Sequence, residues 1–157
     1  VGVDPFRGGN MRMTSDEYFA NNEKIFEVIH VDGLHEYEQV QKDIINALEC
    51  LSADGIIILD DLLPKSESQE YVPRKTKSFW SGDVWKVSVE LMTSNNLHYC
   101  IANIFPGIGI LKKGHNYSYN KMNEKLINMR FNDFMKYYKE LPIVDCETAF
   151  KFIEKKV

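Results

Sequence analysis

The sequence predicts an α/β fold in which parallel strands alternate with helices. Two short apolar runs, residues 25–31 and 55–59, each lead into acidic residues, and an amphipathic segment lies between them, as is typical of a βαβ unit. The carboxyl ends of parallel strands joined by a crossover helix meet at one edge of the sheet, where open α/β sheets bind their ligands. We therefore expect Asp32, Asp60 and Asp61 to lie close together.

Three neighbouring carboxylates repel one another unless a raised pKa, a basic partner or a divalent cation relieves the repulsion. We predict a metal site on Asp32, Asp60 and Asp61, with magnesium as the ion. Successive side chains of a regular strand face opposite ways, so the chain must leave strand geometry at the acid pair, as Pro64 also indicates. In the alternative interpretation, one aspartate caps a loop or helix and the others are solvated.

Composition narrows the classes of function. The chain has 157 residues, the length of one domain, and its 44% hydrophobic and 27% charged residues are typical of an ordinary globular protein. A net charge of -4 argues against nucleic acid as a partner. Cys50, Cys100 and Cys146 form no CxxC pair, so neither a disulfide framework nor a zinc site is expected, and Cys50 is expected to be a buried free thiol. Without a signal peptide or membrane-length apolar run, we expect a cytoplasmic protein and no membrane partner.

The N-terminal part is expected to contribute two short strands and a helix. Residues 1–4 have the apolar pattern of a strand that ends at Asp4, and residues 11–14 could form a second short strand. Ser15 is expected to be the N-cap of the following helix, whose first turn is acidic. Further along, His30 lies inside the strand at 25–31, and we expect it to pack in the core.

A helix with a core-facing stripe is expected after Asp32 and Gly33. The stripe follows helical spacing and comprises Tyr37, Val40, Ile44, Leu48 and Leu51. His35 lies near the start of this helix, at the mouth of the same crevice as the acids. Since an imidazole titrates near neutral pH, it can take a proton from a substrate hydroxyl, although a purely structural histidine is the alternative.

The second half begins with a polar loop, residues 62–82, of a length uncommon in compact domains unless it is a lid or disordered. Tyr71 and Trp80 could stack on a substrate there, and the basic residues at 74, 75 and 77 could bind an anionic one.

A helix capped by Asp83 is expected over 82–91, with Trp85 in the core. An antiparallel hairpin is expected at 97–104 and 108–113, and helices at 123–138 and 148–155. The aromatic stripe on 131–138 is expected to be a packing or dimer surface.

The order of three segments carries a family resemblance. Val3-Asp4-Pro5, Val31 to Tyr37 and Gly55 to Asp61 resemble successive segments of a class I S-adenosylmethionine (SAM)-dependent methyltransferase, and the resemblance covers residues 1–113. It is nearest to metal-dependent small-molecule O-methyltransferases that act on sugars, macrolide glycosides and catechol-like hydroxyls. The resemblance implies a Rossmann-like doubly wound sheet of order 3-2-1-4-5-7-6 with an antiparallel C-terminal hairpin. Residues 1–157 would form a single, partial methyltransferase domain with a helical C-terminal extension at 114–157.

The chain departs from the family at its start. Residues 1–4 take the place of the family's second strand, and no GxGxG stretch occurs anywhere in the sequence. The family's first strand belongs in the middle of the sheet, where its absence would leave backbone groups unpaired. We therefore expect a sheet truncated at its N-terminal side, a longer parent polypeptide, and little activity from these residues alone.

The resemblance also assigns roles to site residues. It assigns Asp4 to the ribose of SAM, with a turn cap before Pro5 as the alternative, and it places Met13, Thr14 and Ser15 beside the adenine. Asp32 would contribute to cofactor binding, catalysis and the metal. In some related macrolide methyltransferases the histidine at this Asp-x-x-His spacing is the proposed base, which implies that role for His35.

The sequence thus predicts a SAM-dependent O-methyltransferase that acts on a hydroxyl of a sugar or natural product and is assisted by Mg²⁺, with a second copy of the chain as a candidate partner in a homo-oligomer. Two alternatives stay open. The fold could serve as a non-catalytic binding or assembly module, or the same acidic cluster could belong to a metal-dependent hydrolase or hydroxylase.

Overall fold

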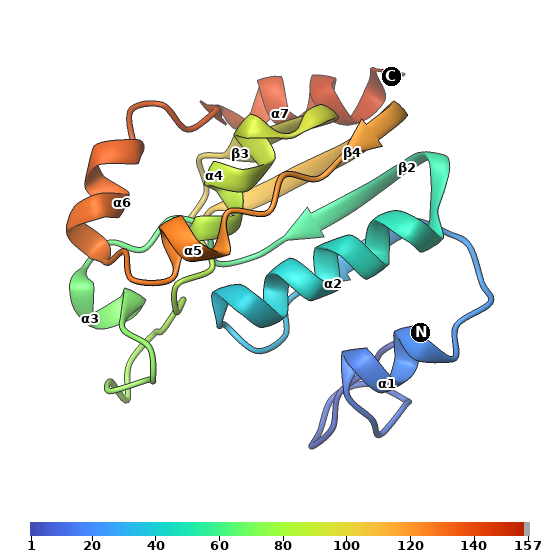
Figure 1. Ribbon diagram of the computed structural model, residues 1–157, viewed down its shortest axis with the longest axis horizontal. Coiled ribbons are helices and arrows are strands. Elements are labelled where there is room, and N and C mark those ends of the chain that lie inside the picture. Colours follow the sequence, from blue (N-terminus) through green and yellow to red (C-terminus); the bar gives the residue numbers. More distant parts are fainter. Residues whose placement is uncertain (156–157) are drawn as a thin grey trace.

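The two apolar runs form adjacent parallel strands of a five-stranded sheet in the computed structural model, which describes residues 1–155 (Figure 1). The sheet order is β1-β2-β4-β3-β5, with β1 and β2 parallel, β4 antiparallel to both β2 and β3, and β5 parallel to β3. The strands are β1 (Phe26–Val31), β2 (Leu51–Leu59), β3 (Asn95–Ala102), β4 (Ile108–Ser118) and β5 (Ile143–Val144). This arrangement confirms the α/β class and the antiparallel hairpin, and it matches the 4-5-7-6 part of the order implied by the resemblance.

Helices cover both faces of the sheet. The helices of the described residues are α1 (Ser15–Ala20), α2 (Tyr37–Cys50), α3 (Glu67–Glu70), α4 (Lys86–Thr93), α5 (Asn123–Leu126), α6 (Phe131–Tyr137) and α7 (Cys146–Glu154). Alternate residues of β3 and β4 enter two separate clusters: Ile101 and Leu111 join the large core beneath α2 and α4, whereas Cys100 and Ile110 pack against α7. Because alternate side chains of a strand point to opposite faces of the sheet, each of these strands packs against a helical layer on either side.

The N-terminal segment lies beside α2 and apart from the sheet (Figure 1). The two strands expected at 1–4 and 11–14 are reduced to one parallel bridge between Val3 and Met11. The helix that follows is capped by Thr14 rather than Ser15, because Thr14 and Glu17 form a reciprocal capping box. Among the described residues, β1 has a strand partner on one edge only, so β1 is an edge strand of the sheet.

Several element boundaries differ from the expectation. Leu51 begins β2 instead of ending the helical stripe, and α4 starts at Lys86. Asp83 does not cap α4: its carboxylate accepts the backbone N–H of Tyr37 at 2.7 Å and the Nζ–H of Lys86 at 2.7 Å, and so caps α2 instead. Such a contact across 46 residues is invisible to a local pattern.

The C-terminal part is less regular than predicted. The helix expected over 123–138 is divided into α5 and α6, and β5 between α6 and α7 was not expected. The segment 114–157 therefore holds, in its described part, three helices together with the end of β4 and strand β5. Trp85 and Cys50 are buried, as predicted, and Cys50 is a free thiol. Among the described residues, no helix has the length and apolar character needed to span a membrane.

Candidate active site

Three side chains meet where β1 and β2 end. His35 Nε2 lies 3.1 Å from Asp61 Oδ2 and 3.4 Å from Asp32 Oδ1. Asp32 follows β1, Asp61 follows β2, and His35 precedes the first turn of α2, so the βαβ connection brings all three together. The side chain of Asp61 is only 6% exposed, whereas that of Asp32 is 45% exposed. The cluster therefore has one buried wall and one side open to a ligand.

The acid pair leaves strand geometry, as the sequence indicated. Asp61 has a left-handed backbone with φ 65°, and its N–H donates to Asp60 Oδ1 at 2.8 Å. This turn directs the two carboxylates to different neighbours. Asp61 joins Asp32 and His35, whereas Asp60 joins Asp32 and His30, and within each group the candidate ligand atoms lie within 4.8 Å of one another. Asp32 is thus the acid shared by both groups.

The loop at 62–82 fixes His35 from the other side. His35 Nδ1 lies 2.8 Å from the Trp80 carbonyl oxygen, and the Trp80 indole stacks on the imidazole with ring centroids 5.4 Å apart. A carbonyl oxygen can only accept a hydrogen bond, so Nδ1 carries the proton and Nε2 faces the carboxylates. Gly82 has φ +61°, and a Cβ there would overlap with the His35 carbonyl oxygen, so only glycine permits this close approach.

The charges of the cluster perturb one another. Burial raises the pKa of Asp61 to about 6, with help from the Asp60 and Asp32 carboxylates and against the opposing effect of His35. A hydrogen bond from His35 lowers the pKa of Asp32. Burial lowers the pKa of His35, but Asp32, the Trp80 carbonyl and the Asp61 charge outweigh it, and the net pKa is raised. The imidazole therefore becomes neutral only above its usual titration range.

The cluster contains side chains that could hold a cation. Asp61 Oδ1 is buried and accepts no hydrogen bond from the described residues, although such atoms usually have a partner. A cation beside it would supply the missing interaction, and the Trp80 carbonyl already orients Nε2 as a ligating nitrogen. Both groups combine one imidazole with two carboxylates, a donor set that suits Mn²⁺ better than Mg²⁺, which prefers oxygen ligands alone.

The residues predicted for the cofactor lie in the N-terminal segment. Asp4 Oδ1 accepts the backbone N–H groups of Phe6 and Arg7, both at 2.7 Å, so Asp4 forms the turn cap that was the alternative interpretation. These hydrogen bonds lower the pKa of Asp4. Its second oxygen is not used in this turn, so an ionised carboxylate is still offered to a ribose hydroxyl.

The hydroxyls predicted beside the adenine already have partners. The side chain of Thr14 is engaged in the capping box with Glu17, and Ser15 Oγ accepts from Gln39 Nε2 at 3.3 Å, which ties α1 to α2. Met13 is half-buried. Of the three residues proposed for this pocket, Met13 is the one whose side chain the fold does not engage in a hydrogen bond.

Sequence reasoning missed two parts of the site. His30 is exposed at the end of β1 and joins Asp32 and Asp60, so the prediction that it packs in the core is wrong. An Asp two residues after a strand histidine was the available signal, because both side chains then project from one face. Trp80 was predicted to stack on a substrate, yet it stacks on His35, and no sequence pattern links residues 45 apart.

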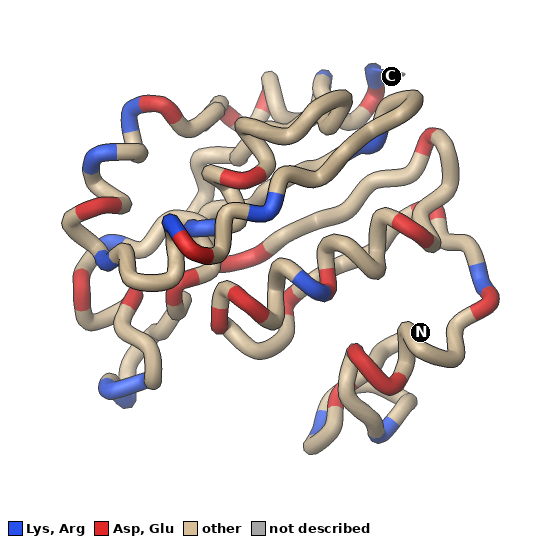
Figure 2. Tube along the Cα trace, viewed as in Figure 1, with Lys and Arg blue, Asp and Glu red and all other residues tan. Residues whose placement is uncertain are grey.

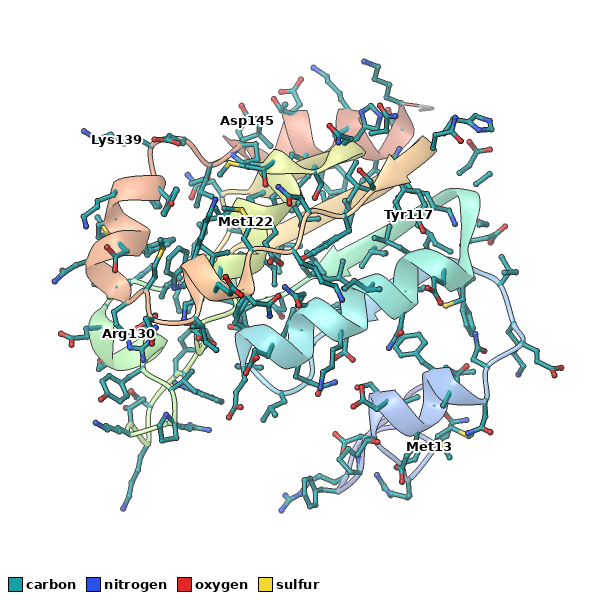
Figure 3. All side chains as sticks on the ribbon, viewed as in Figure 1. Met13, Tyr117, Met122, Arg130, Lys139 and Asp145 are labelled. Carbon is teal, nitrogen blue, oxygen red and sulfur yellow. The ribbon has the colours of Figure 1, made fainter. Side chains whose placement is uncertain are left out.

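A buried polar network holds the start of α2 in place behind the cluster. Glu90 is fully buried and accepts hydrogen bonds from the hydroxyls of Tyr37 and Tyr119, at 2.6 and 2.7 Å, and from the backbone N–H of Met122 at 2.6 Å. Met122 is labelled in Figure 3, before the turn of α5. Together with Asp83, this network fixes Tyr37, the first residue of α2, two positions after His35.

Charge is distributed unevenly around the site. Acidic residues mark the ends of β1 and β2 and the start of α2, whereas basic residues gather at the tip of the 62–82 loop (Figure 2). The loop tip holds Arg74 over the Trp80 ring and Lys75 over the Tyr71 ring. The basic side chains thus lie on the loop that packs on His35.

Comparison with known proteins agrees with this geometry. A family model described as a methyltransferase domain matches residues 7–62, a segment that runs from the N-terminal loop to the residue after Asp61. No curated protein matches the chain at a significant level. The matched segment contains β1, α2 and β2 and every residue of the cluster. Residues 7–62 therefore carry the signature of a methyltransferase domain, which supports the resemblance of this segment to the class I SAM-dependent methyltransferases.

Proposed function

We propose that the protein transfers the methyl group of SAM to a hydroxyl of a small molecule, with His35 as the base. The methyltransferase-domain match supports the reaction class, for which SAM is the usual donor. The observation that carries the proposal is the orientation of His35. Its protonated Nδ1 donates to the Trp80 carbonyl, and its Nε2 lies next to Asp32, the exposed carboxylate of the cluster.

The chain's own residues perform the proton transfer in this scheme. The acceptor oxygen forms a bond to the methyl carbon as the sulfur–carbon bond breaks, and the hydroxyl proton passes to His35 Nε2. Asp32 and Asp61 stabilise the imidazolium that results, since both carboxylates lie within 3.4 Å of Nε2. When bound, SAM supplies an electrophilic methyl group and a divalent cation supplies positive charge that favours the deprotonated hydroxyl.

A divalent cation is part of the proposal, held by Asp32, Asp60 and Asp61 with His30 as the imidazole ligand, so that His35 Nε2 stays free to act as the base. The unpartnered Asp61 Oδ1 supports it. We keep three predictions from the sequence: the acceptor is a hydroxyl of a sugar or natural product, the protein is cytoplasmic, and it forms a homo-oligomer. The two alternative functions, a non-catalytic module and a metal-dependent hydrolase or hydroxylase, also stay open.

Methyl transfer to a catechol and to a glycoside, measured with labelled SAM, tests the proposal. His35→Gln should lower the rate by about 100-fold, the usual contribution of a general base. His98→Gln is the matched control, because His98 is exposed on β3 away from the cluster, and it should leave the rate unchanged. Chelation followed by return of Mn²⁺ or Mg²⁺ then tests the cation. Equal rates for His35→Gln and the parent protein would contradict the assignment of the base.

A further inference from the structure

An apolar groove of about 530 Å³ opens beside the cluster. Three segments line it: residues 63–65 after β2, residues 103–105 between β3 and β4, and one face of α6. We call it the α6 groove. Its volume falls within the range of about 300–1,000 Å³ that is typical of small-molecule sites.

The α6 groove begins two residues after the acid pair of the proposed active site. Leu63 follows Asp61 by two residues, so their Cα atoms are at most about 7.6 Å apart at 3.8 Å per residue. On the loop side, Phe79 packs on Phe105 with ring centroids 4.7 Å apart, and Phe79 precedes Trp80, which stacks on His35. The segment after β2 and the Phe79–Trp80 part of the loop therefore join the walls of the groove to the cluster.

The walls of the groove expose apolar and aromatic surface. Ile104 is 47% exposed, Phe105 46%, Met135 50% and Tyr138 38%, although all four are side chains that usually gain from burial. The aromatic stripe of α6 thus has two functions: Phe134 packs on Trp85 in the core, whereas Met135 and Tyr138 line the groove. Flat aromatic walls favour a planar ligand.

A single formal charge lies among the groove residues. Lys65 Nζ sits 4.2 Å from the centre of the Phe105 ring, and none of the ion pairs within residues 1–155 involves it. The protein as a whole carries a net charge of -4, so a cation at an apolar groove next to an acidic cluster is a local reversal of sign. It favours a ligand with an acidic group at one end.

We propose that the α6 groove binds the methyl acceptor, and that the acceptor is an aromatic hydroxy acid. Its ring system lies against Phe105 and α6, its carboxylate pairs with Lys65, and its hydroxyl points toward Asp61 and His35. This inference rests on the proposed function, because it names the substrate class of the same site.

A pair of matched fluorescent probes tests the proposal: 6-hydroxy-2-naphthoate, which has both the ring system and the acid, and 2-naphthol, which lacks the acid. Lys65→Ala should weaken binding of the acid about fivefold, as the loss of one partly exposed ion pair predicts, and that of 2-naphthol less than twofold. Met135→Asp should weaken both about tenfold by placing a charge on the apolar wall, and its half-exposed position makes the change compatible with folding. Lys77→Ala, an exposed lysine of the same loop, is the control and should bind both probes normally.

Binding of both probes that is unchanged in Lys65→Ala and Met135→Asp would overturn the proposal. Met135→Asp that converts a dimer to a monomer in sedimentation, with probe binding intact, would also overturn it and assign the groove to a second copy of the chain. Methyl transfer from SAM distinguishes failure of the proposed function from failure of the groove proposal. Lys65-dependent binding without any transfer refutes the proposed function and leaves the groove as a binding site. Equal rates of methyl transfer to both probes in every variant would support the proposed function and refute the assignment of the α6 groove as the acceptor site.

Discussion

Asp61→Asn should make the protein more stable at alkaline pH while damaging the site. The substitution replaces a buried carboxylate with a neutral amide of nearly the same shape. Asparagine tolerates the left-handed backbone found here, φ 65°, better than most residues, so the turn after β2 is retained. The new amide N–H can donate to the lone pair of His35 Nε2, which removes the repulsion between that lone pair and an ionised Asp61.

The magnitude follows from the pKa of Asp61, which burial raises from its ordinary value of 3.8 to about 6. Between these values the native state binds more protons than the unfolded state, so the free energy of unfolding falls as pH rises through this window. At about 1.4 kcal/mol per pKa unit, the full penalty above pH 6 is about 3 kcal/mol. This pKa already includes the opposing charge of His35, and partial screening by water reduces the penalty further, so we expect about 1–2 kcal/mol.

Urea unfolding in the presence of a chelator measures this difference. At pH 8 the free energy of unfolding of Asp61→Asn should be about 1–2 kcal/mol higher than that of the parent protein. At pH 4 the two free energies should agree within about 0.5 kcal/mol. Glu23→Gln, which removes an exposed carboxylate, should change neither value. Added Mn²⁺ should stabilise the parent protein more than Asp61→Asn. A variant that is less stable at pH 8, or equally shifted at both pH values, would refute the account of Asp61 as an uncompensated buried acid.

The remaining predictions concern the support of the site and its pH dependence. Gly82→Ala should destabilise the protein by about 2 kcal/mol or more, since the new Cβ overlaps with the His35 carbonyl oxygen, and thermal unfolding should show a loss of several degrees. Phe134→Ala should cost about 3–5 kcal/mol in urea unfolding, because Phe134 is 1% exposed, whereas Met135→Ala on the exposed side of α6 should cost about 0.5 kcal/mol or less. The rate of methyl transfer should rise with pH on the alkaline side of the ordinary histidine range, because the pKa of His35 is raised and the neutral imidazole is the base. Asp32→Asn should move this rise to lower pH, since the Asp32 hydrogen bond helps to raise that pKa.

Features set by local periodicity were predictable from the sequence. The βαβ unit and the hairpin follow from alternating or helical apolar patterns over six or more residues, and the structure has both. The meeting of Asp32, His35 and Asp61 was also predictable, because parallel connection rules bring strand ends to one edge. These parts of the site are encoded within one supersecondary unit.

Contacts between distant segments were not predictable in this way. Asp83 caps α2 from 46 residues away, and Trp80 fixes the tautomer of His35 from 45 residues away. Strand β5 has two residues and exists because β3 offers it a free edge, so it has no periodicity of its own. His30 is exposed because β1 lies at the sheet edge, which depends on the neighbours of the strand and not on its composition.

The most direct test of the central claim is calorimetric binding of S-adenosylhomocysteine to the protein, with and without a divalent cation. We expect a dissociation constant of about micromolar order, and weaker binding by Asp4→Ala and by Asp32→Ala. The absence of binding by the folded protein would contradict assignment of these residues to a SAM-dependent methyltransferase site.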